Sequence, residues 1–255
     1  MALRLSACVE MIFRDLPFAD RLEAVAKAGL PAFEFWGLAD KDVDAIARKQ
    51  VETGLQCATF LGGGRVPLVE PDRRAEFVGA VHEAIAVARR LGTHALIVTT
   101  GQELPGVSRE AQRASVVAGL KAAASIAADA GITLVLEPLN VLVDHKGYFL
   151  WSSAEAFGIL DEVGSPAVKL LYDIYHQQIT EGNLIATITA NIGRIGHVHV
   201  ADVPGRHEPG TGEINYRNVF AAIDASGYSG YVGLEYRPQA DPAATLATVR
   251  ALAEV

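Results

Sequence analysis

The chain has 255 residues and a mass of 27.1 kDa; 50% of its residues are hydrophobic and 20% are charged. This balance supports a large buried core and excludes a disordered chain. The net charge of −8 and the sequence pI of about 5.4 argue against a general affinity for nucleic acid or anionic membranes, which requires clustered Lys and Arg.

Cysteine usage and the N-terminal sequence predict a cytoplasmic protein. The two cysteines, Cys8 and Cys57, form neither a CxxC pair nor a disulfide framework, which fits a reducing compartment. The start MALRLSACVEM lacks the uninterrupted apolar core of a signal peptide. No apolar stretch approaches the roughly 18 residues that a membrane span needs. We therefore expect no membrane contact.

Short apolar runs rich in β-branched residues alternate along the chain with longer segments of helical spacing. Eight runs are predicted as strands, at 3–8, 32–36, 55–60, 95–99, 132–137, 168–172, 195–200 and 231–235. Helical spacing is clear at 18–28, 73–91, 109–130 and 154–163. Glycines that suit a left-handed C-cap follow helical segments at Gly29, Gly54, Gly92, Gly131, Gly164 and Gly227. Ser152 and Glu155 predict a capping box, and Asp241 before Pro242 predicts an N-cap.

Eight β–α units with strands buried on both faces predict an α/β fold, a parallel (β/α)8 TIM barrel. A doubly wound open sheet is the alternative. No composition break or linker divides the chain, so residues 1–255 are expected to form a single domain. Long insertions follow strands at 61–71, 100–108 and 202–216, and loops in these positions form the active-site rim of a barrel.

Four side chains lie at or just past the ends of separate predicted strands: Glu137, Asp173, His199 and Glu235. The carboxyl ends of parallel strands meet at one end of the sheet, so these side chains are expected to converge. Three carboxylates and one imidazole suit a divalent cation, with Mn²⁺, Mg²⁺ or Co²⁺ preferred and Zn²⁺ as a further candidate. A single strand-end acid is as often part of an ordinary ion pair. Three acids at equivalent positions favour a metal site.

Neighbouring residues are candidates for contacts with a substrate. His197 alternates with His199 on one face of its strand, and the deeper His197 is expected to fill the core. His176 follows Asp173 by three residues; it either polarises a substrate oxygen or caps the next helix. Arg206 lies on a glycine-rich, flexible loop, where its guanidinium suits a phosphate or a carboxylate; the alternative is a mobile surface loop.

The segment FEFW at the end of the second strand places Glu34 and Trp36 in the expected pocket wall, with ordinary packing as the alternative. The chain has no GxSxG elbow, no Walker loop and no GxGxxG after the first strand. Their absence argues against a hydrolase elbow, an NTPase and a dinucleotide-binding enzyme. A metal-dependent enzyme acting on a small molecule is the leading hypothesis.

Four motifs resemble the hydroxypyruvate isomerase family of the xylose-isomerase-like TIM-barrel superfamily: LEPLN, YDIYHQQ, HVHVADVPGRHEPGTGEINY and GYVGLEYRP. The resemblance implies a divalent metal at the four strand-end residues and the interconversion of aldehyde and ketone forms of small hydroxycarbonyl acids or sugars. Through the related ketose 3-epimerases it implies that Glu137 and Glu235 are paired acid–base groups. The same relatives imply that His176 and Arg206 bind the substrate.

We therefore predict an aldose–ketose isomerase, with hydroxypyruvate and 2-hydroxy-3-oxopropanoate (tartronate semialdehyde) as the leading pair. Enediolate proton transfer is the expected route, and a metal-assisted hydride shift is the alternative. The nearest rival is a ketose 3-epimerase or another sugar isomerase. Epimerases carry His at the position of His199, where hydroxypyruvate isomerases often carry Gln, so His199 resembles the epimerases. Epimerases also carry a substrate-binding Glu at the position of Val143, and in this feature the chain departs from them.

A more distant alternative is a metal-dependent apurinic endonuclease, which shares the barrel and the metal chemistry. Such an enzyme needs a basic groove for DNA, and the acidic pI disfavours one. The sequence leaves open the identity of the metal and whether the chain forms a homo-oligomer.

Overall fold

Strands and helices alternate along the chain as the sequence predicts. The computed structural model describes residues 3–254, in which nine strands form one sheet in the order β3-β2-β1-β9-β8-β7-β6-β5-β4. Every neighbouring pair of strands is parallel. The strands are β1 (Arg4–Cys8), β2 (Ala32–Glu34), β3 (Gln56–Cys57), β4 (Thr59–Leu61), β5 (Ala95–Val98), β6 (Thr133–Leu136), β7 (Val168–Asp173), β8 (Ile195–Val200) and β9 (Tyr231–Leu234).

The two ends of this order, β3 and β4, are consecutive pieces of one segment separated by Ala58. The first piece pairs with β2 and the second with β5, which closes the sheet into a barrel. Ala58 itself donates its N–H to Phe33 O at 2.8 Å. The segment corresponds to the predicted third strand, 55–60, so the eight-stranded parallel barrel is confirmed and the open doubly wound sheet is excluded. The other strands match their predicted ranges to within one or two residues at each end.

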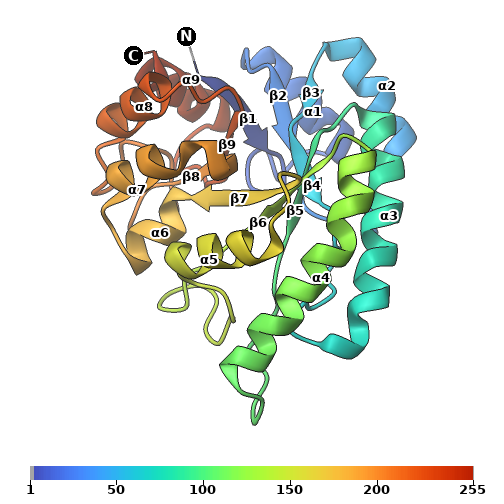
Figure 1. The fold of residues 1–255 in the computed structure, drawn as a ribbon. Coiled ribbons are helices and arrows are strands. Elements are labelled where there is room, and N and C mark those ends of the chain that lie inside the picture. Colours follow the sequence, from blue (N-terminus) through green and yellow to red (C-terminus); the bar gives the residue numbers. More distant parts are fainter. Residues whose placement is uncertain (1–2, 255) are drawn as a thin grey trace.

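Helices lie outside the strands and cover the barrel (Figure 1). They are α1 (Phe18–Lys27), α2 (Val43–Thr53), α3 (Arg74–Leu91), α4 (Arg109–Asp129), α5 (Ser153–Val163), α6 (Ile174–Thr180), α7 (Leu184–Asn191), α8 (Tyr216–Ala225) and α9 (Pro242–Ala253), with short 3-10 turns η1 (Pro71–Arg73) and η2 (Ile192–Arg194). None of the helices within residues 3–254 has the length and apolar character that a membrane crossing requires.

Most of the predicted helix caps are present. All six proposed C-cap glycines have positive φ, between 66° and 77°. Asp241 accepts the Ala244 N–H at 2.9 Å, as expected of an N-cap. Ser152 accepts the Glu155 N–H, but the Glu155 side chain pairs with Arg109 of α4 instead of turning back to Ser152. The capping box is therefore only half formed.

The inside of the barrel is divided between an apolar side and a polar side. Ile97, Val135 and Leu171, from β5, β6 and β7, form a separate buried cluster. Across from them Ser6 of β1 and Glu34 of β2 meet His197 of β8, and all three are buried. Because side chains alternate along a strand, the residue two positions after each of these inward-facing residues also faces the interior, nearer the carboxyl end of the barrel.

Candidate active site

The four strand-end residues converge at the carboxyl end of the barrel. Glu137 follows β6, Asp173 ends β7, His199 lies in β8 and Glu235 follows β9. One ligand atom from each lies within 4.8 Å of the others, and all four side chains are buried. They come from four adjacent strands, and the period-two alternation turns each of them inward.

The cluster has the donor set that a divalent metal ion requires. His199 Nδ1 lies 3.4 Å from Glu235 Oε2, 3.5 Å from Glu137 Oε1 and 4.0 Å from Asp173 Oδ2. Neither this buried nitrogen nor Nε2 of the same ring makes a hydrogen bond within residues 3–254. Three carboxylates around an unbonded imidazole nitrogen fit a divalent cation bound mainly by oxygen.

The two carboxylate oxygens of Asp173 have different roles: one caps helix α6 and the other faces the cluster. Its Oδ1 accepts the N–H groups of Tyr175 at 2.8 Å and His176 at 3.3 Å, which caps the N-terminus of α6. Its Oδ2 faces the cluster and lies 3.6 Å from Arg206 Nη2. The cap therefore fixes the orientation of the carboxylate toward the site.

Arg206 lies against the cluster as the sequence predicts. Its Nη2 pairs with Glu235 Oε2, its Nε donates to the Glu235 main-chain oxygen at 3.4 Å, and its guanidinium stacks 5.0 Å from the ring centre of Tyr175. Trp36 Nε1 donates to the other oxygen of Glu235 at 2.8 Å. Although burial acts against ionisation of Glu235, the charges of Arg206 and His199 hold its pKa well below the ordinary value.

The other two carboxyls differ from Glu235 in their electrostatics. Burial raises the pKa of Glu137 and of Asp173, and neighbouring carboxylates add to this effect. Glu137 Oε1 has its one ion-pair contact within residues 3–254 at His199. Glu137 is thus the carboxylate of the cluster with the fewest competing donors.

His176 is buried and neutral, and its tautomer follows from its partners. Burial, with the nearby charge of Arg206, lowers the pKa of His176 well below the ordinary value. The Asn140 N–H donates to His176 Nδ1 at 3.2 Å, so the ring hydrogen is on Nε2. Nε2 has no hydrogen-bond partner within residues 3–254 and lies 3.5 Å from Asp173 Oδ2. His176 therefore offers a free N–H donor beside the cluster.

The structure corrects the expected place of Glu34. This residue does not line the pocket: it is 2% exposed and lies beneath His199, one alternation step deeper than Trp36. Trp36 is 37% exposed and lines the pocket, as expected. The expectation for FEFW counted both side chains as part of the wall, but in a barrel only the last inward-facing residue of a strand reaches the mouth.

The loop that carries Arg206 is firmly bonded, which corrects the expected flexible loop. Asp202 is fully buried; its Oδ1 accepts the N–H groups of Val203 and Ile214, and its Oδ2 accepts that of Gly210 at 2.8 Å. At Gly212 a Cβ atom would lie 2.1 Å from Val203 O, so only glycine fits there. The glycines of this loop therefore allow close packing, and the Asp202 carboxylate bonds to the main chain on both sides of Arg206.

A pocket of about 470 Å³ opens above the cluster. Besides the predicted residues Trp36, Glu137, His176, His199, Arg206 and Glu235, its lining includes Met11, Arg65, Asp144, His145 and Arg237. The place of Arg237 in the pocket could have been predicted from the sequence, because it follows Glu235 by two positions and so lies on the same side of the chain. Arg65, Asp144 and His145 lie on loops, where no periodicity indicates direction.

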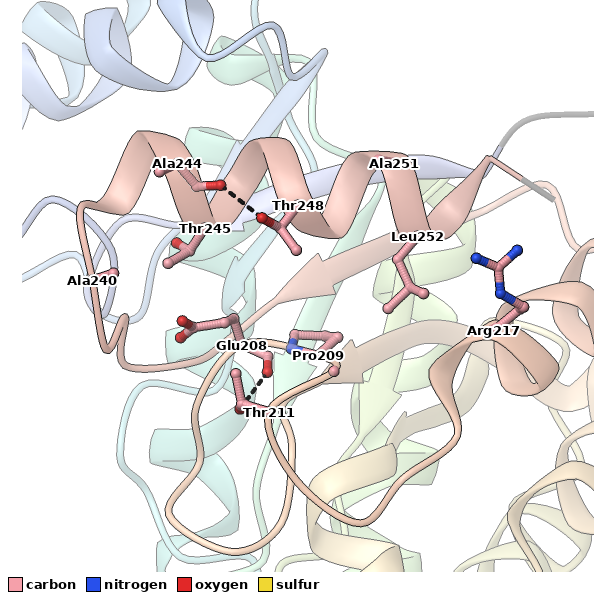
Figure 2. Close-up of a pocket in the computed structure, with 11 residues that line it drawn as sticks. Glu208, Pro209, Thr211, Arg217, Ala240, Ala244, Thr245, Thr248, Ala251 and Leu252 are labelled. Atoms are coloured by element: carbon pink, nitrogen blue, oxygen red, sulfur yellow. Dashed lines mark hydrogen bonds between the residues drawn. The ribbon is translucent and has the colours of Figure 1, made fainter.

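A second hollow, of about 520 Å³, lies between α9 and the loop that precedes α8, outside the barrel (Figure 2). Several of its polar groups, though not the exposed Arg217 side chain, have partners within residues 3–254. The Glu208 carboxylate accepts the Gln239 N–H, and the hydroxyls of Thr211 and Thr248 donate to main-chain oxygens. The converging titratable groups are in the barrel mouth, which is therefore the candidate active site.

The sequence and fold have known relatives. Residues 22–254 match the family model described as xylose isomerase-like TIM barrel. The chain is 37% identical to the hydroxypyruvate isomerase of Escherichia coli strain K12, over 93% of this chain and 94% of the relative. It is 34% identical to the 2-oxo-tetronate isomerase of Cupriavidus necator, over 95% and 96%.

Among solved structures, a protein from Brucella melitensis named AP endonuclease, family 2, superposes with a TM-score of 0.91 at 33% identity, over 97% of this chain and 98% of that one. The closed parallel barrel and the cluster at its carboxyl end agree with these matches. This chain belongs to the xylose isomerase-like TIM barrel family.

Proposed function

We propose that the protein is a divalent-metal-dependent isomerase that interconverts the ketone and aldehyde forms of a small hydroxy-oxo acid. Hydroxypyruvate and 2-hydroxy-3-oxopropanoate are the leading pair. The curated relatives are named isomerases of this kind, and the chain is an enzyme of the hydroxypyruvate isomerase type. The observation that carries the proposal is the buried cluster of Glu137, Asp173, His199 and Glu235 under a pocket of small-molecule size.

The four cluster residues would hold one divalent ion. When bound, the ion would supply positive charge that stabilises the negative charge developing on the two substrate oxygens. Mn²⁺, Mg²⁺ and Co²⁺ suit this oxygen-rich set, and Zn²⁺ remains a candidate. The unbonded His199 Nδ1, turned toward three carboxylates, supports this assignment.

Proton transfer falls to the two glutamates. One carboxylate takes the proton from the hydroxyl-bearing carbon, and the same or the other carboxylate delivers it to the neighbouring carbon, while the hydroxyl proton passes to the former carbonyl oxygen. Glu137 is the better proton carrier, because Glu235 is held by Trp36 and Arg206 while Glu137 contacts only His199 among the charged groups described. The His176 Nε2–H is placed to hold a substrate oxygen between the two transfers.

The proposal is tested by assaying metal-replete protein with hydroxypyruvate, 2-oxo-tetronate and neutral ketoses, and by identifying the products by NMR. We expect kcat/KM to be at least about tenfold higher for an acid than for any ketose, since one charge-assisted contact distinguishes them. A second candidate is a ketose epimerase, which is favoured by His199 and by the Asp144 carboxylate that lines the pocket directly after Val143. Turnover of ketoses with no conversion of either acid would establish that candidate instead.

Arg206 is proposed to bind the substrate carboxylate. An Arg206→Ala variant is expected to lose about 10- to 100-fold in kcat/KM for hydroxypyruvate, and much less for a neutral ketose that has no carboxylate to bind. Arg206→Lys retains the charge without the planar fork, so its kcat/KM for hydroxypyruvate is expected to lie between those of the parent and Arg206→Ala. Steady-state kinetics on both substrate types measure the difference.

Arg237→Ala is the comparison variant, because Arg237 lines the same pocket but has no side-chain ion pair within residues 3–254. A selective loss of the acid in Arg237→Ala, with equal losses on both substrates in Arg206→Ala, would reassign carboxylate recognition to Arg237. Arg206 would then act only as a partner of Glu235 and Asp173.

A further inference from the structure

We propose that Glu34 is a positioning residue that fixes the ring hydrogen of His199 on Nε2 and so leaves the Nδ1 lone pair for the metal. The inference rests on the proposed metal dependence. It assigns a role to a buried carboxylate that touches neither the pocket nor, on this account, the ion. Its basis is the geometry of the polar side of the barrel interior.

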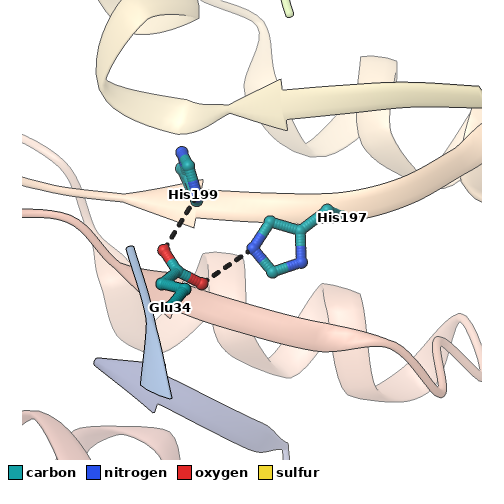
Figure 3. Close-up of side chains that lie close together, drawn as sticks. All are labelled: Glu34, His197 and His199. Atoms are coloured by element: carbon teal, nitrogen blue, oxygen red, sulfur yellow. Dashed lines mark hydrogen bonds and ion pairs between the residues drawn. The ribbon is translucent and has the colours of Figure 1, made fainter. Parts of the chain in front are cut away.

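The Glu34 carboxylate lies between two imidazoles of β8 (Figure 3). Its Oε2 is hydrogen-bonded to His197 Nε2 at 3.0 Å, and its Oε1 lies 2.9 Å from His199 Nε2 in an ion-pair contact whose angles are not those of a hydrogen bond. Glu34 and both histidines are no more than 2% exposed, so water does not compete for these contacts. An ionised carboxylate has no hydrogen to donate, and two lone pairs repel each other at these distances, so the nitrogen that faces the carboxylate carries the hydrogen.

The consequence for His199 follows from the imidazole itself. A neutral ring has one N–H and one lone pair, so a hydrogen on Nε2 leaves the lone pair on Nδ1. Nδ1 is the nitrogen that faces Glu137, Asp173 and Glu235. A carboxylate behind a metal-ligating histidine also makes the ring a more basic ligand and fixes its rotation.

The carboxylate is itself held in place from two other directions. Ser6 Oγ donates to Oε2 at 2.7 Å, which together with His197 occupies that oxygen and leaves Oε1 for His199. On β9, a Cβ atom added to Gly233 would lie 2.4 Å from Oε1, 2.5 Å from Oε2 and 2.7 Å from His199 Cδ2. A glycine at 233 is therefore the condition for Glu34 to reach His199.

Glu34, His197 and His199 are also close enough to form a ligand group of their own. We assign them to positioning because Ser6 already donates to Glu34, and because His199 would have to serve two ions with one ring. A positioning role for Glu34 predicts one bound ion per chain, whereas a second ligand group predicts two. Calorimetric titration of the metal-free parent protein with Mn²⁺ is expected to give one ion per chain, and two ions would overturn the assignment.

The decisive variant is Glu34→Gln, which keeps the shape of the side chain but can face His199 with either an oxygen or an NH₂ group. We expect its affinity for Mn²⁺ to be about 10- to 100-fold lower than that of the parent. Gly233→Ala is expected to weaken binding in the same direction by displacing the carboxylate without changing any charge. Equal affinity in Glu34→Gln and the parent would overturn the inference while leaving the metal site intact.

A measurement on the parent protein tests the tautomer directly, whether or not the variants fold. In ¹H–¹⁵N spectra of the protein loaded with diamagnetic Zn²⁺, the His199 ring hydrogen is expected on Nε2. A hydrogen on Nδ1 would overturn the inference. If the parent bound no divalent cation at all in calorimetry, the metal dependence under the proposed function would fail first, and this inference with it.

Discussion

Replacing Glu137 by glutamine is expected to lower kcat for the isomerisation by about 10²- to 10⁴-fold, the range that a positioned general acid–base group contributes. An amide cannot accept and return the substrate proton, whereas its oxygen can still contribute to ion binding. Glu235→Gln is expected to give a loss of similar size, with an additional change in the contacts of Arg206. Steady-state kinetics at saturating metal measure both losses.

The reaction route has its own measurement. In D₂O the parent enzyme is expected to place deuterium on the substrate carbon that gains the proton. Complete retention of the original hydrogen over many turnovers would favour a hydride shift or a proton shielded from solvent. Glu83→Gln, an exposed substitution on α3, is the matched control and should leave kcat unchanged. A Glu137→Gln enzyme with nearly parental kcat would remove Glu137 from the chemistry.

Removing divalent cations is expected to abolish turnover, and restoring Mn²⁺, Mg²⁺ or Co²⁺ is expected to recover it. Protein treated with chelator and then dialysed should also unfold at a lower temperature, because an ion that binds only the folded state stabilises it by about 2.7 kcal/mol at 100 times its Kd. Activity assays and thermal unfolding on the same samples measure both effects. Mn²⁺, Mg²⁺, Co²⁺ and Zn²⁺ are compared in parallel.

His199→Asn is the site variant for this experiment and His82→Asn, an exposed histidine of α3, is its control. His199→Asn is expected to lose both the turnover and the stabilisation by metal, and His82→Asn is expected to lose neither. Full activity in chelated, dialysed protein would contradict the metal dependence. It would leave the glutamates as metal-independent acid–base groups.

The sequence predicts the barrel and the cluster well because both depend on local periodicity. Each apolar run has a clear end, and parallel strands bring those ends together, so Glu137 and Asp173 could be placed without any contact information. Depth within the barrel is a different matter. Glu34 and Trp36 have the same inward orientation, but only the structure shows where β2 ends relative to the mouth.

The differences between sequence and structure arise from contacts between distant residues. The break at Ala58 depends on which neighbours β3 and β4 pair with, and no residue nearby signals it. The loop carrying Arg206 contains enough glycine to predict flexibility, but Asp202 bonds to amides eight and twelve residues later in the chain. Such a contact has no local pattern. Arg65 and Asp144 reach the pocket from loops for the same reason.

The double use of Asp173 limits which acid can occupy this position. Its side chain is short enough to cap α6 through one oxygen while the other faces the cluster. The side chain of a glutamate is one methylene longer, so its carboxylate could not keep both contacts. Either the helix would lose its cap or the cluster would lose its third oxygen donor. The aspartate and the two glutamates around His199 are therefore not interchangeable, although they carry the same charge. The choice of acid at 173 is made by the start of a helix as much as by the cluster around His199.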